Sequence, residues 1–410
     1  MADIRPFRAI RPAAEYAAQI AALPYDVYNR AEAVKVVAAN PLSFLKIDRA
    51  ETQFDDSVDT YDPKVYEKAR DTYLSMKQEG YFVADETENY YIYELTMDGR
   101  AQTGIVCCAS IDDYQNGVIK KHENTRADKE EDRIRHVDTM SAQTGPIFLA
   151  YHADPVIAET IRRIKSEPPV NDFVAEDGIG HRVWIIDAKG DIAKIRDAFA
   201  AMDAIYIADG HHRCASAVKV GCKRREENPG YDQDAEFNCF LSVLFPDDEL
   251  MIMDYNRVVK DLNGHSTEET LEFLKSVGTI TPVATMQGPA RKGQCSVYCA
   301  GKWYLLDFDP KLLHDDPVLG LDVSILQDHV LNPYFGIVDP KTDKRIEFIG
   351  GIRGLLELKR RVDTDCAIAF AMYPTQISEL FAVADAGKLM PPKSTWFEPK
   401  LRSGLFIHEI

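Results

Sequence analysis

Apolar residues recur at helical spacing in several parts of the chain, and the clearest case lies at residues 63–79. Val65, Ala69 and Tyr73 are four residues apart and therefore share one face of a helix. Asp62 stands directly before this segment and can accept a hydrogen bond from the first-turn amides, as N-cap residues do. The pattern predicts an amphipathic helix with a defined start.

Weaker patterns of the same kind predict further helices. One helix carries Ile134, Val137 and Met140 at three-residue spacing. Another opens on Ser266 and Glu269, which have the spacing of a capping box. Other helices are expected near residues 192–202, 214–220, 321–331 and 375–386.

Short runs rich in β-branched and aromatic residues, bounded by turn residues, predict strands. Residues 90–97 and 102–111 are joined through Asp98 and Gly99 and predict a hairpin. A second hairpin, turning at Pro246, is expected at 237–259. Further expectations are a hairpin at 294–309, strands at 182–187, 204–208 and 366–373, and strand and loop in the first forty residues.

The predicted helices and hairpins follow one another without a regular strand–helix–strand rhythm. This mixture favours an α+β fold over a doubly wound parallel sheet. At about 150 residues per domain, 410 residues predict two or three domains. We place the boundary near residue 260, which divides the chain into a core domain, 1–260, and a smaller α+β domain, 261–410.

Composition changes this picture mainly by what it excludes. The chain has 48 basic and 66 acidic residues and a net charge of −18, so nucleic acid is a disfavoured partner. No apolar run reaches the roughly 18 to 20 residues that cross a bilayer, and the N-terminus lacks the apolar stretch of a secretory signal. We predict a cytoplasmic protein, without membrane contact, whose 8 cysteines are reduced packing thiols. The oligomeric state stays open, a homodimer included.

The sharpest candidate for chemistry follows the predicted strand 204–208. Asp209, Gly210, His211, His212 and Arg213 occupy the junction between that strand and the next helix. A glycine turn and the free amides of a helical first turn bind phosphate. Arg213 adds a bidentate cation, the histidines add donors or proton-transfer groups, and Asp209 can hold magnesium or accept a proton. The alternative is a capping aspartate followed by two surface histidines.

A second polar cluster precedes the helix that carries Ile134. Glu123 and Asn124 supply the oxygen ligands that magnesium prefers, and Arg126 supplies a phosphate clamp. The alternative is a charged, solvated loop that caps the helix. His136, later on the same helix, is equally compatible with a place at the site and with a place in solvent.

Two further loops carry ligand-type side chains. Asp26, between a proline and aromatic residues, is a candidate base or an ordinary turn aspartate. Lys393 follows two prolines near the C-terminus and precedes Ser394 and Thr395. It offers a phosphate contact or belongs to an ordinary exposed loop.

These residues also carry a resemblance. The strand followed by residues 209–213 resembles the signature of the ParB-like and sulfiredoxin-like superfamily, in the Asp-Gly-His-His-Arg form of its free serine kinase branch. Residues 123–126 are similar to the Glu-Asn-x-x-Arg stretch of ParB-like proteins. Together with residues 5–7 and 391–395, they make the whole chain resemble a bacterial and archaeal family known as a conserved domain of unknown function.

The resemblance implies a ParB/sulfiredoxin-like nucleotide-binding core that uses ATP or ADP and Mg²⁺. It implies phosphoryl transfer to a small hydroxyl-bearing molecule such as serine. Three groups of residues follow from it: catalytic Asp209, His212 and Glu123; nucleotide- or phosphate-binding Gly210, His211, His212, Arg213, Arg126 and Lys393; and metal-binding Asp209, Glu123 and Asn124.

The chain departs from two branches of that superfamily. Sulfiredoxin has its reactive cysteine where this chain has His211, and ParB partition proteins have a helix-turn-helix domain that is not recognisable here. A nucleotide-responsive DNA-binding protein and a non-catalytic nucleotide sensor remain as alternatives to the kinase. A hydrolase with a metal on His211 and His212 ranks last, because adjacent histidines chelate one ion less easily than a helical i, i+4 pair.

Overall fold

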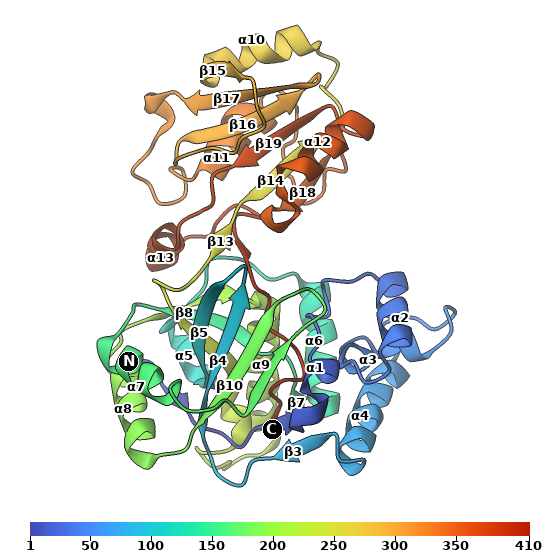
Figure 1. Cartoon of the computed structure of the whole chain (residues 1–410), viewed down its shortest axis with the longest axis vertical. Coiled ribbons are helices and arrows are strands. Elements are labelled where there is room, and N and C mark those ends of the chain that lie inside the picture. The colour runs from blue at the N-terminus through green and yellow to red at the C-terminus, as the bar shows by residue number, and fades with distance from the viewer. The chain divides into compact units, whose positions relative to one another are not determined.

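The computed structural model describes residues 1–410 and divides them into two compact units (Figure 1). Unit 1 comprises Met1–Leu250 together with Pro399–Ile410, and unit 2 comprises Met251–Glu398. The predicted division lay near residue 260 and assigned the C-terminal residues to the second domain. None of the helices combines the length and apolar character needed to cross a bilayer.

The C-terminal tail, residues 399–410, belongs to unit 1 because its backbone pairs there. Ile407 exchanges backbone hydrogen bonds with Ile10. Next to it, β21 (His408–Glu409) pairs with β7 (Ala142–Gln143). Sequence patterns cannot predict these partners, because they lie hundreds of residues away along the chain.

Unit 1 is built on a mixed nine-stranded sheet in the order β6-β11-β8-β12-β5-β4-β10-β9, with β1 also paired to β5. In this sheet β12 is parallel to β8, and β11 is parallel to β6. All other paired strands of the sheet are antiparallel. The strands are β1 (Ile4–Arg5), β4 (Tyr90–Met97), β5 (Arg100–Ser110), β6 (Ile119–Lys120), β8 (Ile147–Tyr151), β9 (Asn171–Val174), β10 (Gly180–Ile186), β11 (Ile205–Asp209) and β12 (Cys239–Pro246). A separate short pair joins β2 (Ile10–Pro12) to β3 (Phe82–Ala84).

Two apolar cores hold the helices of unit 1 in place. One core joins the sheet to α7, α8 and α9 through residues such as Ile157, Phe199 and Val218. The other joins α2, α3 and α4, which Figure 1 shows as a group beside α6, to the C-terminal Ile407. The helices are α1 (Ala17–Ile20), α2 (Arg30–Ala39), α3 (Leu45–Asp48), α4 (Pro63–Gln78), α5 (Ile111–Asn116), α6 (Ala127–Met140), α7 (Pro155–Ile164), α8 (Lys189–Ala200) and α9 (His211–Glu227).

Unit 2 contains a six-stranded antiparallel sheet in the order β15-β17-β16-β19-β14-β18, against which α12 packs through Leu358. Its strands are β13 (Ile252–Met253), β14 (Tyr255–Val259), β15 (Gly278–Val283), β16 (Gln294–Cys299), β17 (Lys302–Phe308), β18 (Ile346–Gly350), β19 (Ile368–Met372) and β20 (Trp396–Phe397). Its helices are α10 (Thr267–Val277), α11 (Asp322–Leu326), which continues as a π-helix over Gln327–Leu331, α12 (Gly354–Thr364) and α13 (Ile377–Asp385). Both units combine helices with largely antiparallel sheets, so the fold is α+β.

Local start signals predicted several elements correctly. The Asp62 side chain accepts from the Lys64 amide at the start of α4, and Ser266 forms the expected capping box with Glu269. The prediction of strands and loops for the first forty residues is wrong at residues 30–39, which form the helix α2. There Asn29 and Glu32 form a second capping box, and a proline such as Pro24 restricts only the residue before it.

The predicted hairpin at 237–259 is wrong. Strand β12 pairs with β5 and β8 in unit 1, whereas β14 pairs with β18 and β19 in unit 2. The residues between these two strands lead from one unit to the other. Apolar runs indicate that a segment is a buried strand, but they do not specify which strand lies next to it.

His181 in β10 is fully buried, and its protonation state follows from its neighbours. Arg402 donates to its Nε2 at 3.2 Å, and the Tyr93 hydroxyl lies 2.8 Å from Nδ1. A neutral ring that accepts at Nε2 carries its proton on Nδ1. Burial, and next the charge of Arg402, lower the pKa of His181 to about 3, although Asp177 acts in the opposite sense.

The free energy of unfolding of unit 1 should therefore depend on pH through His181. Between pH about 6.5 and 3 the unfolded chain binds a proton that the folded chain does not, so stability falls as pH falls, by up to about 1.4 kcal/mol per pH unit. When the free energy of unfolding is measured by urea at several pH values in this window, its change per pH unit should be smaller for His181→Asn than for the wild type. The exposed His314→Asn change should leave the slope unaltered, and equal slopes in wild type and His181→Asn would contradict the assignment.

Candidate functional site

The junction between β11 and α9 presents a turn of uncapped amides. Gly210 lies between them with φ of 91°, a left-handed conformation that glycine adopts without strain. It has no side chain with which to cap the helix, so the first-turn amides of α9 lack that acceptor. The Gly210 amide itself donates to Oδ1 of Asp209 at 2.7 Å. The helix end therefore keeps donors and a partial positive charge for a ligand.

Asp209 is ionised and lies beside two cations. Lys400 in the C-terminal tail donates from Nζ to Oδ2 at 2.9 Å. Burial raises the pKa of Asp209, but Lys400, Arg213 and the Gly210 amide outweigh it and hold that pKa well below its usual range. The sequence did not predict Lys400, which is 191 residues from Asp209 and carries no motif of its own.

Arg213 folds back over the turn on which it stands. Its Nη2, Nε and Cζ lie 3.1, 3.2 and 3.3 Å from the position that a Cβ on Gly210 would take. Nη1 donates to the Pro146 carbonyl at 2.7 Å and lies 3.4 Å from the corresponding position on Gly145. A side chain at Gly210 would press against the guanidinium, whereas at Gly145 the close neighbour would be Oγ of Ser403 at 3.0 Å.

The two polar clusters predicted from the sequence meet at the histidines. The Arg126 amide donates to Nε2 of His212 at 2.9 Å, which ties the loop before α6 to the start of α9. Burial lowers the pKa of His212, while Asp26 and Glu130 raise it. Since Nε2 accepts, the neutral ring carries its proton on Nδ1. In this state His212 can donate to a ligand but cannot act as a base through Nε2.

His211 and His122 form a buried pair behind this contact. Their rings are edge to face with centroids 4.5 Å apart, and the His122 amide lies 3.5 Å from Nε2 of His211. Burial lowers the pKa of His122 to about 4 and that of His211 well below its ordinary value. Both rings are therefore neutral, and the ring of His211 is buried, so that only its backbone amide lies at the turn.

The remaining predicted residues have different surroundings. Glu123 is half-buried and Asn124 is exposed on the same loop, where the exposed Arg126 guanidinium pairs with Asp128 at 2.8 Å. Lys393 lies in unit 2, exposed, with Nζ 5.6 Å from the centre of the Tyr255 ring. Asp26 is exposed near His212, on whose pKa its charge acts.

A buried polar network that the sequence did not predict adjoins Arg213. Arg133 pairs with Asp132 at 2.8 Å and lies over the Tyr25 ring, 4.0 Å from its centre. His136 is buried here rather than in solvent, and burial lowers its pKa to about 4. The signal in the sequence was present, because these three residues of α6 share a helical face with the apolar Met140.

A small polar cavity lies between this network and Arg213. Its volume is about 40 Å³, room for about three water molecules. The polar side chains that line it are Tyr25, Asp48, Arg133, His136, Gln143, Thr144, Arg213 and Ser403. A second cavity of about 60 Å³ shares Tyr25, Asp48, Arg133 and His136.

The Asp209–Lys400 contact can be tested by a double-mutant cycle in urea unfolding. Lys400→Met and Asp209→Asn should each destabilise unit 1, and the double variant should lose less than their sum, with a coupling of about 1 kcal/mol for this partly exposed pair. The same cycle on Lys194 and Asp191, whose charged atoms are 3.9 Å apart, serves as a control near zero. A coupling no larger than that of the control would contradict a specific pairing of Lys400 with Asp209.

Comparisons with known proteins place the chain in a family. Its sequence matches the family described as Protein of unknown function (DUF1015) over residues 4–324. It matches none of the curated proteins with which it was compared.

Several solved structures are similar at low identity. A free serine kinase mutant in complex with ADP shares 14% identity, with 74% of this chain and 93% of that chain covered and a TM-score of 0.35. SbnI with a C-terminal truncation, from Staphylococcus aureus, shares 11%, with 72% and 85% covered and a TM-score of 0.36. A conserved hypothetical protein from Pyrococcus furiosus shares 15%, with 73% and 93% covered and a TM-score of 0.35.

These TM-scores are too low to establish a common fold. The family match covers most of the chain, in agreement with the resemblance that its motifs carry. The chain therefore belongs to the DUF1015 family of proteins of unknown function.

Proposed function

We propose that this protein is a nucleotide-binding phosphotransferase that uses ATP or ADP with Mg²⁺ and phosphorylates a small hydroxyl-bearing metabolite. The observation that carries the proposal is the uncapped start of α9 with Arg213 folded across Gly210. Phosphoryl transfer depends mainly on positioning and on neutralising charge, which is what amides and a guanidinium on one turn supply. The proposal also agrees with the free-serine-kinase form of the motif at residues 209–213.

The phosphates are assigned to the turn itself. The amides of His211 and His212 lie in the uncapped first turn of α9, next to Gly210, whose own amide donates to Asp209. The Arg213 guanidinium lies over the same turn. His212 contributes Nδ1–H, because its Nε2 is held by the Arg126 amide. The buried rings of His211 and His122 pack edge to face and join the loop before α6 to the first turn of α9.

The two carboxylates near the turn suit different roles. Asp209 is a weak base because its pKa is held well below the usual range, and we assign it to Mg²⁺. Magnesium is commonly held by one or two carboxylates together with substrate phosphates, a mode that fits Asp209 together with the amide oxygen of Asn124. When bound, the ion neutralises phosphate charge. We assign the acceptor's hydroxyl proton to Glu123.

The charge balance of the site favours a small ligand over nucleic acid. Apart from Arg213, three cations near the turn are paired with carboxylates: Arg126 with Asp128, Arg133 with Asp132 and Lys400 with Asp209. A DNA-binding surface needs basic side chains spread along a groove or face. The polar cavity beside Arg213 instead suits the hydroxyl or carboxylate end of a small metabolite.

Nucleotide binding should depend on Arg213. Loss of a charge-assisted hydrogen bond costs about 1.5–3 kcal/mol, so Arg213→Ala should weaken ADP and ATP binding roughly 10- to 100-fold in isothermal titration calorimetry. Arg162→Ala, an exposed change on α7, is the control and should bind as the wild type does. A folded Arg213→Ala protein with wild-type affinity, or a wild type that binds neither nucleotide, would overturn the assignment.

Transfer itself should be visible by phosphorus NMR. Wild-type protein with ATP or ADP, Mg²⁺ and serine or a related hydroxy compound should form a phosphate monoester, and a chelator should stop the reaction. Glu123→Gln should bind nucleotide yet lose transfer, because the proton acceptor is gone. Nucleotide binding without transfer to any hydroxy compound would point to a sensor, and a DNA mobility shift with CTP would point to a ParB-like role.

A further inference from the structure

A cluster of sulfur and nitrogen donors lies in unit 1, apart from the residues assigned to the nucleotide. Three neighbouring strands build one side of it. Cys108 of β5 lies opposite Arg5 of β1 on one side and opposite Leu241 of β12 on the other. Two residues along β5, Ser110 lies opposite Cys239 of β12. Directly opposed residues point to the same side of a sheet, so both cysteines and Arg5 share one face. The core formed with α7, α8 and α9 lies on the other face, where Cys107 points.

The C-terminal tail brings a histidine onto this face. In the pairing of β21 with β7, His408 lies opposite Gln143. The two Sγ atoms of Cys108 and Cys239 and a ring nitrogen of His408 all lie within 4.8 Å of one another. All three residues are buried, with exposures of 0%, 2% and 1%. None of the cysteines of the chain is in a disulfide.

Both ring nitrogens of His408 have oxygen partners. Nε2 lies 2.7 Å from a carboxylate oxygen of Glu236, and Nδ1 lies 3.3 Å from Oε1 of Gln143. The Gln143 amide is itself fixed, since Oε1 accepts from the Leu241 amide at 2.6 Å and Nε2 donates to the Cys239 carbonyl at 3.3 Å. A metal ion on one nitrogen would replace the oxygen partner of that nitrogen, and the other nitrogen would keep a carboxylate or carbonyl partner of the kind that orients ligating histidines.

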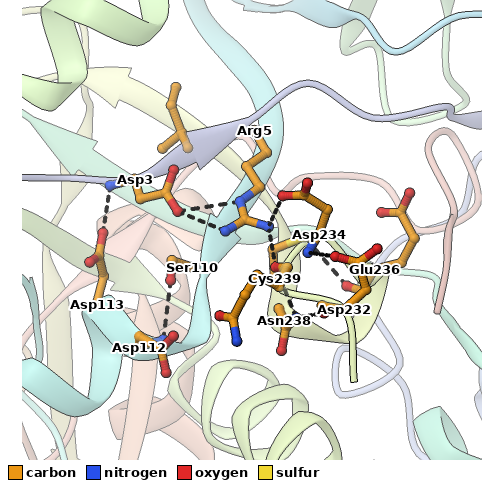
Figure 2. Close-up of polar contacts among 12 residues, drawn as sticks. Asp3, Arg5, Ser110, Asp112, Asp113, Asp232, Asp234, Glu236, Asn238 and Cys239 are labelled. Atoms are coloured by element: carbon orange, nitrogen blue, oxygen red, sulfur yellow. Dashed lines mark hydrogen bonds and ion pairs between the residues drawn. The ribbon is translucent and has the colours of Figure 1, made fainter. Parts of the chain in front are cut away.

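Charge around the cluster also suits a divalent cation. On metal binding, Cys108 and Cys239 would become two thiolates on this buried face, and the carboxylate of the exposed Glu236 would add a third negative charge beside His408. Figure 2 shows Arg5 next to Cys239, with its guanidinium near Asp3 and Asp234. Arg5 is thus already engaged by carboxylates and does not by itself compensate two buried thiolates. A doubly charged ion would complete the balance.

We propose that Cys108, Cys239 and His408 bind one zinc-class transition-metal ion, with Glu236 holding the imidazole in place. Thiolate and imidazole donors select zinc over magnesium or calcium, and such sites are built from three or four of these ligands. Binding releases the thiol protons to solvent and forms two sulfur–metal bonds and one nitrogen–metal bond, with no change of oxidation state. The ion would join β5 and β12 to the C-terminal tail.

The register disfavours a disulfide as the role of this pair. Cys239 is diagonal to Cys108, since it stands opposite Ser110. Diagonal partners have Cα atoms about 7–8 Å apart, beyond the usual reach of a disulfide.

Cobalt titration of the reduced, chelator-treated full-length protein tests the proposal. We expect one Co²⁺ per chain, with sulfur-to-cobalt charge-transfer absorption in the near ultraviolet, and displacement of that signal by one Zn²⁺. Cys108→Ser, Cys239→Ser and His408→Asn should weaken binding at least 100-fold. Cys295→Ser removes a buried cysteine of unit 2 and is the matched control, which should titrate as the wild type does.

Glu236→Gln keeps all three ligands and serves where a ligand variant fails to fold. Loss of the carboxylate that orients a ligating histidine costs 10- to 100-fold in metal affinity, and we expect that loss here. The wild type alone should also show a higher melting temperature with Zn²⁺ than after chelation. A folded wild type that takes up no Co²⁺, a cobalt spectrum without the sulfur band, or a Cys108–Cys239 disulfide in the native protein would overturn the proposal.

Discussion

The return of the C-terminal tail to unit 1 is the constraint on which the rest of that unit depends. Within a few residues the tail supplies Lys400 to Asp209, Arg402 to His181 and His408 to Glu236, and Ile407 adds backbone pairing with Ile10. Along the sequence, unit 2 is an insertion between β12 and this tail. The entropy of closing such a long loop grows only logarithmically with its length, so a folded insertion costs little once the tail contacts form. Detachment of the tail would remove both Lys400 from Asp209 and His408 from the two cysteines, Cys108 and Cys239.

Charge pairing shapes what unit 1 can bind. Buried carboxylates lie next to cations, and the histidines among them are neutral because burial lowers their pKa. This arrangement leaves donor groups, rather than an excess of positive charge, at the turn before α9. A small phosphate-bearing ligand can use such donors locally while the chain as a whole keeps its net charge of −18. The two proposed sites differ in their donor atoms. The nucleotide site offers amides, a guanidinium and carboxylates, whereas the cluster of Cys108, Cys239 and His408 offers thiol and imidazole donors, which suit a softer ion.

Elements with local start and stop signals were predictable, and their partners were not. Asp62 and Ser266 cap the helices that their spacing predicted. The glycine turn at Gly210 was recognised because strand, glycine and helix follow one another directly. The hairpin expected at 237–259 was wrong because its two strands belong to different sheets. The network around Arg133 was missed because charged residues on α6 indicate solvent unless their helical face is known to pack.

The sequence by itself determined the α+β character and the position of the glycine turn before α9, which follow from short-range physics: side-chain periodicity, capping and the conformational freedom of Gly210. Its motifs also indicated the family. Only the tertiary structure brought Lys400 to Asp209, joined the loop of Arg126 to His212 and gathered Cys108, Cys239 and His408. Those groups are separated by dozens to hundreds of residues, and their contacts arise from sheet register and burial. Such pairings are properties of the packed chain as a whole, because no local pattern specifies which distant strand or tail will lie beside another.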